Sequence, residues 1–584
     1  MARQSNYDKF PAIRVADSSA AVDLGWRAIG ARLRGLLPAR RGRAVVCVEC
    51  YPGVFEEEVE RALTEALQPS LVVRTAESFR PPAELQASFE KWLTSDVVFG
   101  RMNSVAIEDF FAPAALAAAR ARISQATGTI LVIGAGASLF TSFPEILVYA
   151  DMARWEIQQR QRHGEIANLG ADNFGDSGAM KYKRAYFIDW RAADRAKIPL
   201  FEHADFYLDT NDRTNPKMIS GRQFLAALEL AARRPFRMVP FFDPGPWGGQ
   251  WMKEVCDLPR DVANYAWCFD CVPEENSLLF DFGGVRIESP AINLVFRHPQ
   301  ALLGDAVHAR FGAEFPIRFD FLDTWDGGNL SLQVHPLTEY IRENFAMNYT
   351  QDESYYLLDA KHDASVYLGL KDAIDQNAMA RDLRAAQNGG ADFPAERYVN
   401  KWPAKKHEHF LIPAGTIHCS GRDCMVLEIS ATPYIFTFKM WDWARLGLDG
   451  APRPIHLDHG LRNIQWDRTT EWVRENLVNR IEPIAAGPGW REERTGLHEL
   501  EFIETRRHWF RGRVLHLTGG SVNVLNLVEG EEAIVESPRG LFDPFIVHYA
   551  ETFIVPAALG DFSVRPHGPS EGRECATIKA YVRT

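Results

Sequence analysis

The character of the chain changes near residue 236, and this change constrains what it can fold into. Before that point, apolar segments rich in Val and Ile alternate with helical stretches, as in Ala44–Val48 followed by Phe55–Leu67. After it, short β-type segments with frequent Gly and Pro dominate, and helices are expected mainly around Leu370–Ala386 and Thr469–Leu477. A chain of 584 residues is also too long for one core. We therefore expect an α/β domain followed by an all-β module.

The first domain, residues 1–235, is expected to contain a mostly parallel sheet. Its predicted strands are Ala44–Val48, Ser70–Arg74 and Thr129–Ile133, and its predicted helices include Phe55–Leu67 and Pro113–Arg122. We also expect a helix from Tyr149 to Glu156 and strand ends at Arg184–Trp190 and Asp205–Asp209. The domain is similar to nucleoside-kinase-like α/β domains in a degenerate form without the phosphate loop, a similarity that implies no activity.

A glycine-rich segment, Gly134-Ala-Gly136-Ala-Ser138, directly follows one of these apolar strands. A phosphate-binding loop would occupy this position, but no Gly-Lys-Ser/Thr follows it and the third glycine of a dinucleotide fingerprint is missing. A glycine turn at a strand end is the favoured interpretation, and a nucleotide or phosphate cradle is the alternative.

Composition excludes several classes of function. The hydrophobic fraction of 46% and the charged fraction of 24% are typical of a soluble protein, and no apolar run reaches the length of a membrane span. The N-terminal residues lack the order of a secretory signal, which predicts a cytoplasmic location. A formal net charge of −12 argues against a nucleic-acid partner. Small phosphorylated ligands need only a local basic pocket and stay possible.

Eight cysteines are too few for a disulfide framework in a chain of this length. Two Cys-x-x-Cys pairs, Cys47/Cys50 and Cys268/Cys271, have the spacing of a zinc ribbon, but they lie far apart. We expect ordinary buried thiols.

An internal repeat indicates two β-barrels after residue 235. Phe410-Leu-Ile-Pro413-Ala-Gly415-Thr-Ile-His418 corresponds to Phe553-Ile-Val-Pro556-Ala-Ala558-Leu-Gly-Asp561, and each copy places an apolar strand before a Pro-Ala corner. Only the first copy ends in a histidine. The expected domains are a first barrel at 236–460 with a metal site and a second, metal-free barrel at 461–584.

Three segments of the first barrel carry metal-ligand side chains. Gln333 and His335 are two residues apart, so they point to the same face of a strand. Glu353 begins another strand and His418 follows the Pro-Ala-Gly corner. Two imidazoles, a carboxylate and an amide oxygen suit Zn²⁺, with room for a substrate or water.

These residues resemble those of the type I phosphomannose isomerases, the class I mannose-6-phosphate isomerases. That family holds zinc with a Gln-x-His strand, a glutamate in the next strand and a histidine in a Pro-x-Gly-Thr-x-His motif. Similar motifs recur over residues 236–584, namely Trp247-Gly-Gly249, Trp441-Asp442-Trp443-Ala444-Arg445 and Asp449 to His459. The resemblance implies two cupin-type, jelly-roll barrels with a small helical insertion, and the zinc ligands Gln333, His335, Glu353 and His418.

The resemblance also implies an activity. An enzyme of this kind interconverts mannose 6-phosphate and fructose 6-phosphate through an ene-diolate that zinc stabilises. Arg445 is the implied catalytic arginine, and Lys439 and Asp442 are implied substrate-binding residues. The lysine that many relatives carry two residues before the metal glutamate is replaced by Gln351, so Lys405, Lys406 or Lys439 would supply the charge. Candidates for the proton-transfer base are Asp442, His407 and His409.

Two alternatives stay open. The chain could be a non-catalytic regulatory protein that binds a sugar phosphate, which the missing lysine favours. It could also be another metal-dependent cupin enzyme, because two histidines and one carboxylate describe non-haem iron oxygenases as well. The role of residues 1–235 and the oligomeric state are undetermined by the sequence.

Overall fold

The computed structural model describes residues 5–15, 22–38, 42–431, 434–496 and 498–584, and it divides into two compact units. Unit 1 comprises Met1–Pro11, Ala231–Asn276 and His298–Thr584, and unit 2 comprises Ala12–Leu230 and Ser277–Arg297. The sequence placed the boundary at 235 and assigned Ser277–Arg297 to the first barrel. The structure corrects that assignment, because this segment forms a hairpin whose sheet lies in unit 2.

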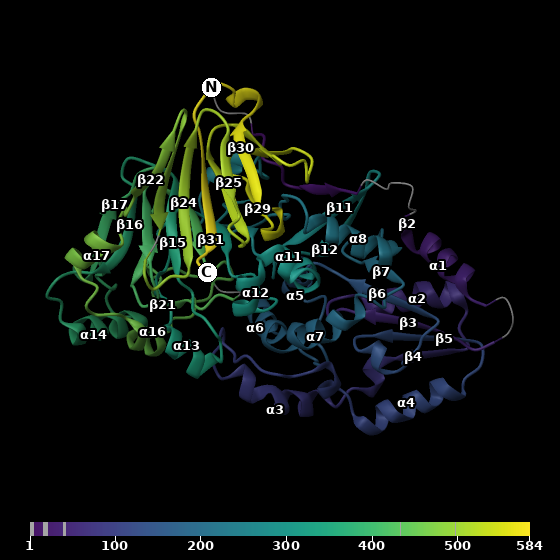
Figure 1. Ribbon diagram of the computed structural model, residues 1–584. Coiled ribbons are helices and arrows are strands. Elements are labelled where there is room, and N and C mark those ends of the chain that lie inside the picture. Colours follow the sequence, from purple (N-terminus) through teal and green to yellow (C-terminus); the bar gives the residue numbers. More distant parts are fainter. Residues whose placement is uncertain (1–4, 16–21, 39–41, 432–433, 497) are drawn as a thin grey trace. The chain divides into compact units, whose positions relative to one another are not determined.

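The main sheet of unit 2 has the strand order β2-β8-β7-β6-β3-β5-β4 (Figure 1). Strands β4, β5, β3, β6 and β7 pair in parallel, and β8 is antiparallel to β7. The central strand, AVVCVEC, is buried along its whole length, as expected for an apolar run covered on both faces. The strands are β2 (Asp23–Leu24), β3 (Ala44–Cys50), β4 (Leu71–Arg74), β5 (Thr129–Gly134), β6 (Ile146–Asp151), β7 (Phe206–Asp209) and β8 (Lys217–Ser220).

Helices connect these strands, as βαβ units require. They are α1 (Gly25–Leu36), α2 (Glu56–Leu67), α3 (Pro82–Leu93), α4 (Pro113–Gln125), α5 (Arg154–Arg162), α6 (Gly178–Arg184), α7 (Trp190–Leu200) and α8 (Gly221–Ala231), with a π-helical segment, η4 (Ala185–Asp189), between α6 and α7.

Two local predictions in unit 2 are wrong. Tyr149–Asp151 ends strand β6, and the predicted helix begins only at Arg154. Arg184–Trp190 was predicted as a strand end but is helical. All five residues of η4 are buried, so no polar face reveals a helical period there. The predicted strand end at Asp205–Asp209 matches β7.

The hairpin that the sequence misassigned completes unit 2. β11 (Ser277–Phe282) pairs antiparallel with β12 (Val285–Pro290) and parallel with β1 (Ala12–Arg14), and α10 (Ile292–Arg297) follows. The hairpin is thus held in unit 2 by the hydrogen bonds that β11 forms with β1.

The first barrel of unit 1 is built from two antiparallel sheets. One has the order β18-β15-β20-β13-β10-β9 and the other β17-β16-β19-β14-β21. Their strands are β9 (Phe241–Asp243), β10 (Trp267–Cys271), β13 (Arg318–Asp323), β14 (Leu332–Val334), β15 (Glu353–Ala360), β16 (Ser365–Leu370), β17 (Val399–Pro403), β18 (His409–Ile412), β19 (His418–Ser420), β20 (Cys424–Ser430) and β21 (Phe438–Trp441).

Short helices complete unit 1. They are α9 (Trp251–Val255), α11 (Pro299–Leu303), α12 (Asp305–Phe311), α13 (Thr338–Phe345), α14 (Gln376–Gln387), α15 (Ala395–Tyr398), α16 (Leu457–Asn463) and α17 (Thr470–Asn476). Two match predicted helices, although Leu370 itself ends β16 and the helix expected there begins only at Gln376.

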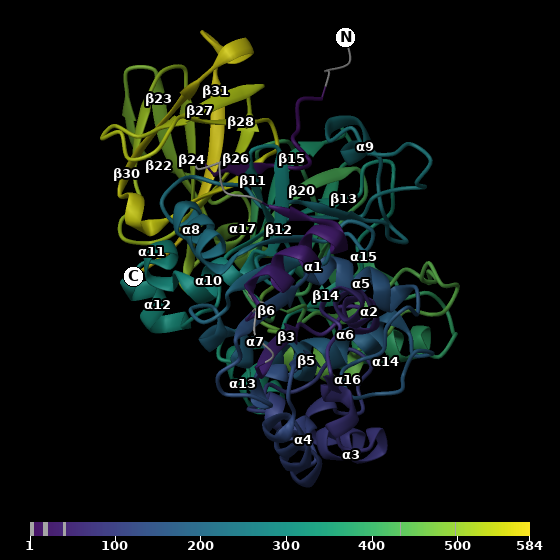
Figure 2. The ribbon, with the colours of Figure 1, turned by 90° about the vertical axis from the view of Figure 1, so that its right-hand side faces the viewer.

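The second barrel repeats the design (Figure 2). Its sheets have the orders β22-β23-β24-β31-β26-β29 and β25-β30-β27-β28. The strands are β22 (Glu482–Gly487), β23 (Trp490–Gly496), β24 (Ile503–Phe510), β25 (Val514–Leu517), β26 (Asn523–Glu529), β27 (Glu532–Glu536), β28 (Phe545–His548), β29 (Thr552–Val555), β30 (Asp561–Pro566) and β31 (Cys575–Val582). Its apolar core includes Leu525, Leu527, Phe553 and Phe562.

The register of the strands relates the two barrels residue by residue. Glu353 pairs with Ile412 and Asn523 pairs with Val555, each partner standing just before the corner proline. Gln333 pairs with His418 and Leu517 pairs with Asp561. In the second barrel the four positions that correspond to Gln333, His335, Glu353 and His418 are therefore Leu517, Gly519, Asn523 and Asp561.

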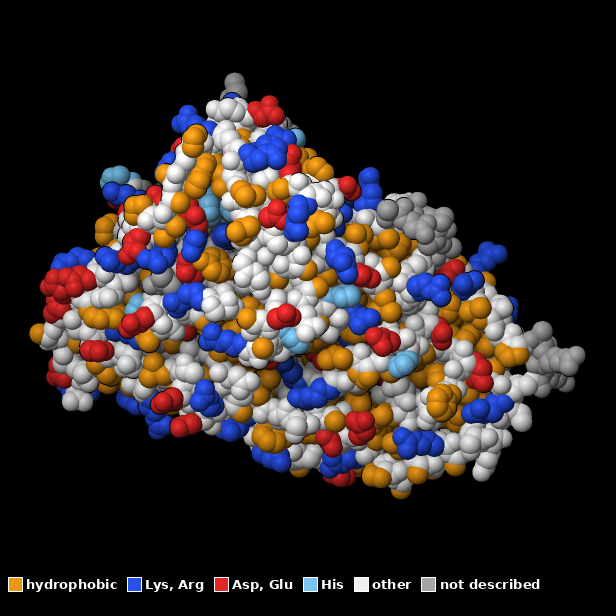
Figure 3. Space-filling view, in the orientation of Figure 1, with side chains coloured by type: hydrophobic (Ala, Val, Ile, Leu, Met, Phe, Trp, Pro, Cys, Tyr) orange, Lys and Arg blue, Asp and Glu red, His pale blue; other side chains and the backbone are white. Residues whose placement is uncertain are grey.

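The surface carries charge of both signs. Basic and acidic side chains are intermingled over the described residues on the face shown in Figure 3. Among the helices that the structure describes, none has the length and apolar character needed to cross a bilayer.

Candidate metal centre

Three side chains predicted as metal ligands meet inside the first barrel. Nε2 of His335 lies 3.1 Å from Oε2 of Glu353, and Nε2 of His418 lies 2.6 Å from Oε1 of the same carboxylate. The two imidazole rings are 5.0 Å apart between centroids. All three side chains are buried, and their ligand atoms all lie within 4.8 Å of one another. Such a cluster could hold one ion.

Main-chain carbonyls fix both rings. Nδ1 of His335 is 3.0 Å from the Phe436 carbonyl oxygen, and Nδ1 of His418 is 2.8 Å from that of Thr416. A carbonyl oxygen only accepts hydrogen bonds, so each Nδ1 carries a proton and Nε2 is the nitrogen that faces the cluster. This is the arrangement in which histidines coordinate metals.

Two atoms of the cluster show that it fits an ion. Nε2 of His335 and Oε1 of Glu353 are buried, and within the described parts of the chain the polar atoms close to them belong to the cluster itself. Buried nitrogen and oxygen atoms that face only one another are suited to hold a cation between them.

Two amides complete the surroundings of the cluster. The Gln333 amide nitrogen lies 3.3 Å from Nε2 of His418, which places this side chain at the fourth position of the expected ligand set. Nε2 of Gln351 donates to Oε2 of Glu353 at 3.1 Å. Gln351 therefore orients the Glu353 carboxylate. The sequence did not suggest this role, because Gln351 was considered there only as a position that lacks the positive charge of a lysine.

Local structure explains why these residues converge. Gln333 on β14 is hydrogen-bonded in register with His418 on β19, so their side chains share a face. Between β18 and β19 the chain turns at Gly415, which has a φ of 86°. A Cβ there would lie 2.8 Å from the carbonyl oxygen of Asn463, so glycine is required.

Electrostatics favour a charged cluster even without an ion. Burial works to lower the pKa of His335, but the neighbouring Glu353 carboxylate outweighs it and the pKa is raised. Burial also opposes ionisation of Glu353, yet the two imidazoles hold its pKa well below the usual range. The carboxylate is thus ready to bind a cation.

A second group of side chains forms a cationic site next to this cluster. Lys439 pairs in register with Gln333 and so shares its face of the sheet. Asp442 accepts from Arg445 at 2.6 Å and from Arg453 at 2.8 Å. Three cations therefore accompany one carboxylate, which leaves an excess of positive charge.

Burial lowers the pKa values of two cations in this cationic site. It lowers the pKa of Lys439 to about 8, and the charge of Arg453 acts in the same direction. The pKa of Arg453 is also lowered, again chiefly by burial. Burial makes the charged forms of these two side chains less favourable, and a bound anion would stabilise both charges.

Arg453 and Ser331 were missed as site residues. The Ser331 hydroxyl donates to Oδ1 of Asp442 at 2.8 Å, and Nη1 of Arg453 lies 3.1 Å from the Ser331 oxygen. Arg453 lies in the segment Asp449 to His459, which resembles a motif of the phosphomannose isomerases, so this resemblance could have identified it as a site residue. Ser331 stands two residues before Gln333, so it too could have been found by period-two spacing.

The candidates for the proton-transfer base do not meet the cluster. His409 pairs with Tyr356, so it lies on the face of the sheet opposite to Glu353 and Tyr355. Burial lowers the pKa of His409 to about 3. His407 hydrogen-bonds to Tyr356 at 2.9 Å and faces Glu529 at 3.2 Å. Asp442 is held by its two arginines.

Of the three lysines expected to replace the missing positive charge near Glu353, two lie away from the metal cluster. Lys406 forms an ion pair with Glu529 at 2.6 Å, and Lys405 is exposed. Lys439 is the predicted substitute that the structure brings beside the ligand set.

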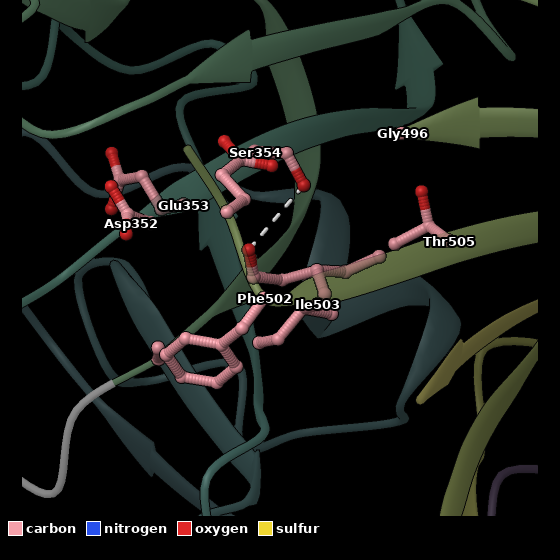
Figure 4. A pocket seen from close by; sticks show the side chains of 10 residues that line it. Asp352, Glu353, Ser354, Gly496, Phe502, Ile503 and Thr505 are labelled. Carbon is pink, nitrogen blue, oxygen red and sulfur yellow. Dashed lines mark hydrogen bonds between the residues drawn. The ribbon is translucent and has the colours of Figure 1, made fainter. Parts of the chain in front are cut away.

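A cavity of about 10 Å³ lies behind Glu353, lined also by Asp352, Ser354 and Glu501 (Figure 4). This volume holds about one water molecule, so it is too small for a sugar. Burial and the nearby Asp352 raise the pKa of Glu501 well above its usual range.

The glycine-rich segment of unit 2 is a turn whose donors are occupied. Gly136 and Ser138 donate their amides to Glu49 at 2.6 and 2.7 Å, and Ala135 donates to Glu56 at 3.0 Å. A Cβ at Gly134 would lie 2.1 Å from the Thr75 hydroxyl oxygen. Because internal carboxylates already bind these amides, the segment offers no cradle for a phosphate.

The cysteines behave as predicted. All eight are free and buried, including both Cys-x-x-Cys pairs. Burial raises the pKa of Cys47 and of Cys268 well above the usual thiol range, which is the reverse of what a metal ligand or reactive thiol requires.

Three comparisons relate the chain to known proteins. Residues 25–233 match a family described as a domain of unknown function (DUF8485). The chain is 24% identical over 236 residues to mannose-6-phosphate isomerase ManA of Bacillus subtilis, covering 40% of this chain and 68% of that protein. It is 24% identical over 217 residues to mannose-6-phosphate isomerase of Streptococcus mutans, covering 37% and 63%.

Among solved structures, the mannose 6-phosphate isomerase from Bacillus subtilis is similar to 60% of this chain. The alignment covers 99% of that structure, with a TM-score of 0.49 and 18% identity. The curated relatives are thus named as mannose-6-phosphate isomerases, at low identity and over part of this chain.

Proposed function

We propose that unit 1 is an aldose–ketose isomerase that interconverts mannose 6-phosphate and fructose 6-phosphate. The observation that supports this most is the buried His335, Glu353 and His418 cluster beside a cationic site. The similarity to proteins named as mannose-6-phosphate isomerases supports the same reaction.

Zn²⁺ is the ion that the donor set fits best. Two imidazole nitrogens, one carboxylate and one amide oxygen, from His335, His418, Glu353 and Gln333, are ligands that zinc accepts in a four-coordinate site. When bound, such an ion polarises a carbonyl group and stabilises the negative charge that develops on the substrate oxygens.

The cationic site would hold the phosphate. Arg445 and Arg453 present guanidinium groups that suit phosphate oxygens, and Lys439 adds an ammonium group on the strand beside them. Ser331 and Gln333 are two residues apart, about 7 Å along an extended strand. This separation suits a six-carbon sugar phosphate, whose reacting carbons and phosphate lie at opposite ends.

Burial contributes to the reaction in its own right. His335 and His418 are inaccessible to solvent and Glu353 is 1% exposed, so little water reaches the reacting carbons. Electrostatic interactions are stronger in such a site than in water. Asp442, which Arg445, Arg453 and Ser331 hold in place, fixes the two guanidinium groups in the orientation that phosphate binding requires.

The test is a coupled assay of the purified full chain with both sugar phosphates, together with metal analysis. We expect one zinc per chain and interconversion that a chelator abolishes. His418→Ala should lose both metal and activity, whereas His362→Ala, which changes a fully exposed histidine, should lose neither. Isomerase activity that survives in His418→Ala would refute the proposal.

The alternatives predict different results in the same experiment. Tight binding of mannose 6-phosphate without product would favour the regulatory protein. Iron in place of zinc after aerobic purification would favour an oxygenase. Either result contradicts the proposed isomerase.

A further inference from the structure

A buried arginine lies in the segment of unit 1 that connects the two barrels. Arg468 follows α16 and precedes α17, and it is 6% exposed. Its Cζ lies 5.5 Å from the ring centroid of Trp472, and its carbonyl accepts from the main-chain N–H of Leu370 at 3.0 Å. A buried guanidinium group is costly unless its N–H groups are hydrogen-bonded. The partners of Arg468 therefore indicate what this residue stabilises.

Nη1 of Arg468 contacts three oxygens of the corner between β18 and β19, the corner that precedes His418. They are the carbonyl oxygens of Pro413 and Ala414, both at 2.8 Å, and the hydroxyl oxygen of Thr416. Carbonyls in such a corner lie outside the hydrogen-bond ladder of the sheet and need other donors. Arg468 provides that donor.

The corner in turn fixes His418. Oγ1 of Thr416 donates to the Pro413 carbonyl at 2.7 Å, and the Thr416 carbonyl accepts from Nδ1 of His418 at 2.8 Å. Thr416 is 1% exposed, so water does not replace these partners. The orientation of the imidazole therefore depends on the position of Thr416, which Arg468 holds.

The connecting segment also contacts the chain beside the other histidine ligand. The main-chain N–H of Gln465 donates to the Gly415 carbonyl at 2.9 Å, and the N–H of Gly415 donates to the His335 carbonyl at 3.0 Å. Oδ1 of Asn463 accepts from the main-chain N–H of Leu337 at 2.8 Å. Hydrogen bonds of this segment thus reach the chain next to both histidines.

A carboxylate holds the same corner from the opposite direction along the chain. Oδ1 of Asp352, the residue before Glu353, accepts from the main-chain N–H of Ala414 at 2.8 Å. Ala414 is therefore bound through its N–H by Asp352 and through its carbonyl by Arg468. Ligands are held in a fixed geometry when the groups around them are themselves hydrogen-bonded in this way.

We propose that Arg468 is a positioning residue for the metal centre, which fixes the corner before β19 and thereby directs Nε2 of His418 toward the ion. It acts through Thr416 and does not touch the ion. Loss of partners that orient a metal ligand lowers metal affinity by roughly 10- to 100-fold. The inference rests on the metal centre of the proposed function but not on the isomerase reaction, so it can fail while the isomerase proposal holds.

The test is the affinity of the metal-depleted full chain for Co²⁺, measured by competition with a chelator, together with the visible absorption spectrum of the bound ion. That spectrum reports the geometry of the ligands. Arg468→Ala should weaken Co²⁺ binding by roughly 10- to 100-fold and shift the absorption bands. Guanidinium ion, added at a concentration too low to unfold the chain, should restore part of both.

Two sets of variants make the test specific. Arg237→Ala is the matched control, because Arg237 is also a buried arginine of unit 1 but pairs with Glu551, at 2.6 Å. It should lower the free energy of unfolding and leave the Co²⁺ affinity and spectrum unchanged. Thr416→Val removes the hydroxyl and should weaken binding by up to roughly tenfold, whereas Thr416→Ser keeps the hydroxyl and should not. This second pair tests the proposal even if Arg468→Ala does not fold.

Three results would each overturn the proposal while leaving the metal centre intact. They are an unaltered Co²⁺ affinity in Arg468→Ala, an equal loss of affinity in Arg237→Ala, and equal affinities in Thr416→Val and Thr416→Ser. Failure of the unaltered chain to bind either Co²⁺ or Zn²⁺ would refute the metal centre, and with it both the proposed isomerase and the role of Arg468.

Discussion

Nε2 of His418 and Oε1 of Glu353 lie 2.6 Å apart, although neither atom is reachable from solvent. The opposite nitrogen of the same ring is fixed by the Thr416 carbonyl. The imidazole cannot turn away from the carboxylate without breaking that bond. A bound ion would therefore find its ligands already oriented.

The first prediction concerns Gln351, which donates to Oε2 of Glu353. Gln351→Leu removes this donor, and we expect metal affinity to fall by roughly 10- to 100-fold because the carboxylate loses its orientation. Competition with a coloured chelator measures the change. Gln387→Leu, on the exposed side of α14, is the matched control. An unaltered affinity in Gln351→Leu would show that the hydrogen bond does not matter.

The second prediction concerns the phosphate site. Arg453→Ala should raise KM for mannose 6-phosphate by roughly tenfold or more while kcat changes little, because a charge-assisted contact to a non-reacting group is lost. Inhibition by inorganic phosphate should weaken in parallel. Steady-state kinetics give both constants.

Arg474→Ala, which removes an exposed arginine on α17, should leave both constants as they are. A fall in kcat with unchanged KM in Arg453→Ala would instead place this arginine at the reacting carbons.

The third prediction is a pH dependence of unit 2. Burial raises the pKa of Glu49 from 4.5 to about 7. The folded state thus prefers the protonated form of this carboxyl, so the contribution of Glu49 to the free energy of unfolding is greatest below pH 4.5 and falls as the pH rises to about 7. Above pH 7, ionisation of the buried Glu49 carboxyl lowers the free energy of unfolding by on the order of 3 kcal/mol relative to its value below pH 4.5.

Glu49→Gln should remove this part of the pH dependence. Protection factors of the Gly136 and Ser138 amides, which donate to Glu49, report it when measured at pH 5 and pH 8. Glu65→Gln is the control. An equal pH dependence in Glu49→Gln and the unaltered chain would contradict the assignment.

The fourth prediction concerns the second barrel. Leu527 is inaccessible to solvent in its core, and Leu527→Ala should lower the free energy of unfolding by about 2–5 kcal/mol. Leu515→Ala makes the same change at a side chain that is 63% exposed and should cost far less. Denaturant unfolding measures both. Equal effects would mean that the core is not packed as described.

Several features of the site could be predicted from the sequence because they follow strand periodicity. Gln333 and His335 share a face by their spacing, and the Pro-Ala-Gly corner placed His418. The partners of the two Nδ1 atoms could not be predicted, since main-chain carbonyls leave no side-chain signature. His409 lies on the wrong face because of its pairing with Tyr356, which only the register shows.

The secondary structure could be predicted where the hydrophobic pattern was compatible with only one kind of element. The apolar run Ala44–Cys50 has the length and composition of a buried strand, and β3 is one. Arg184–Trp190 has no exposed polar face to distinguish a helix from a strand. The hairpin Ser277–Arg297 alternates like its neighbours in unit 1, so only its pairing with β1 shows where it belongs.

That hairpin has a practical consequence for dissecting the molecule. The chain passes from one unit to the other after Pro11, Leu230, Asn276 and Arg297. A truncation starting near residue 236 would strip β11 of its partner β1 and take away Tyr7, whose hydroxyl donates to Asp270. Isolating either half would need the hairpin to be excised and the flanking ends rejoined, so point substitutions in the intact protein are the sounder way to assign activities.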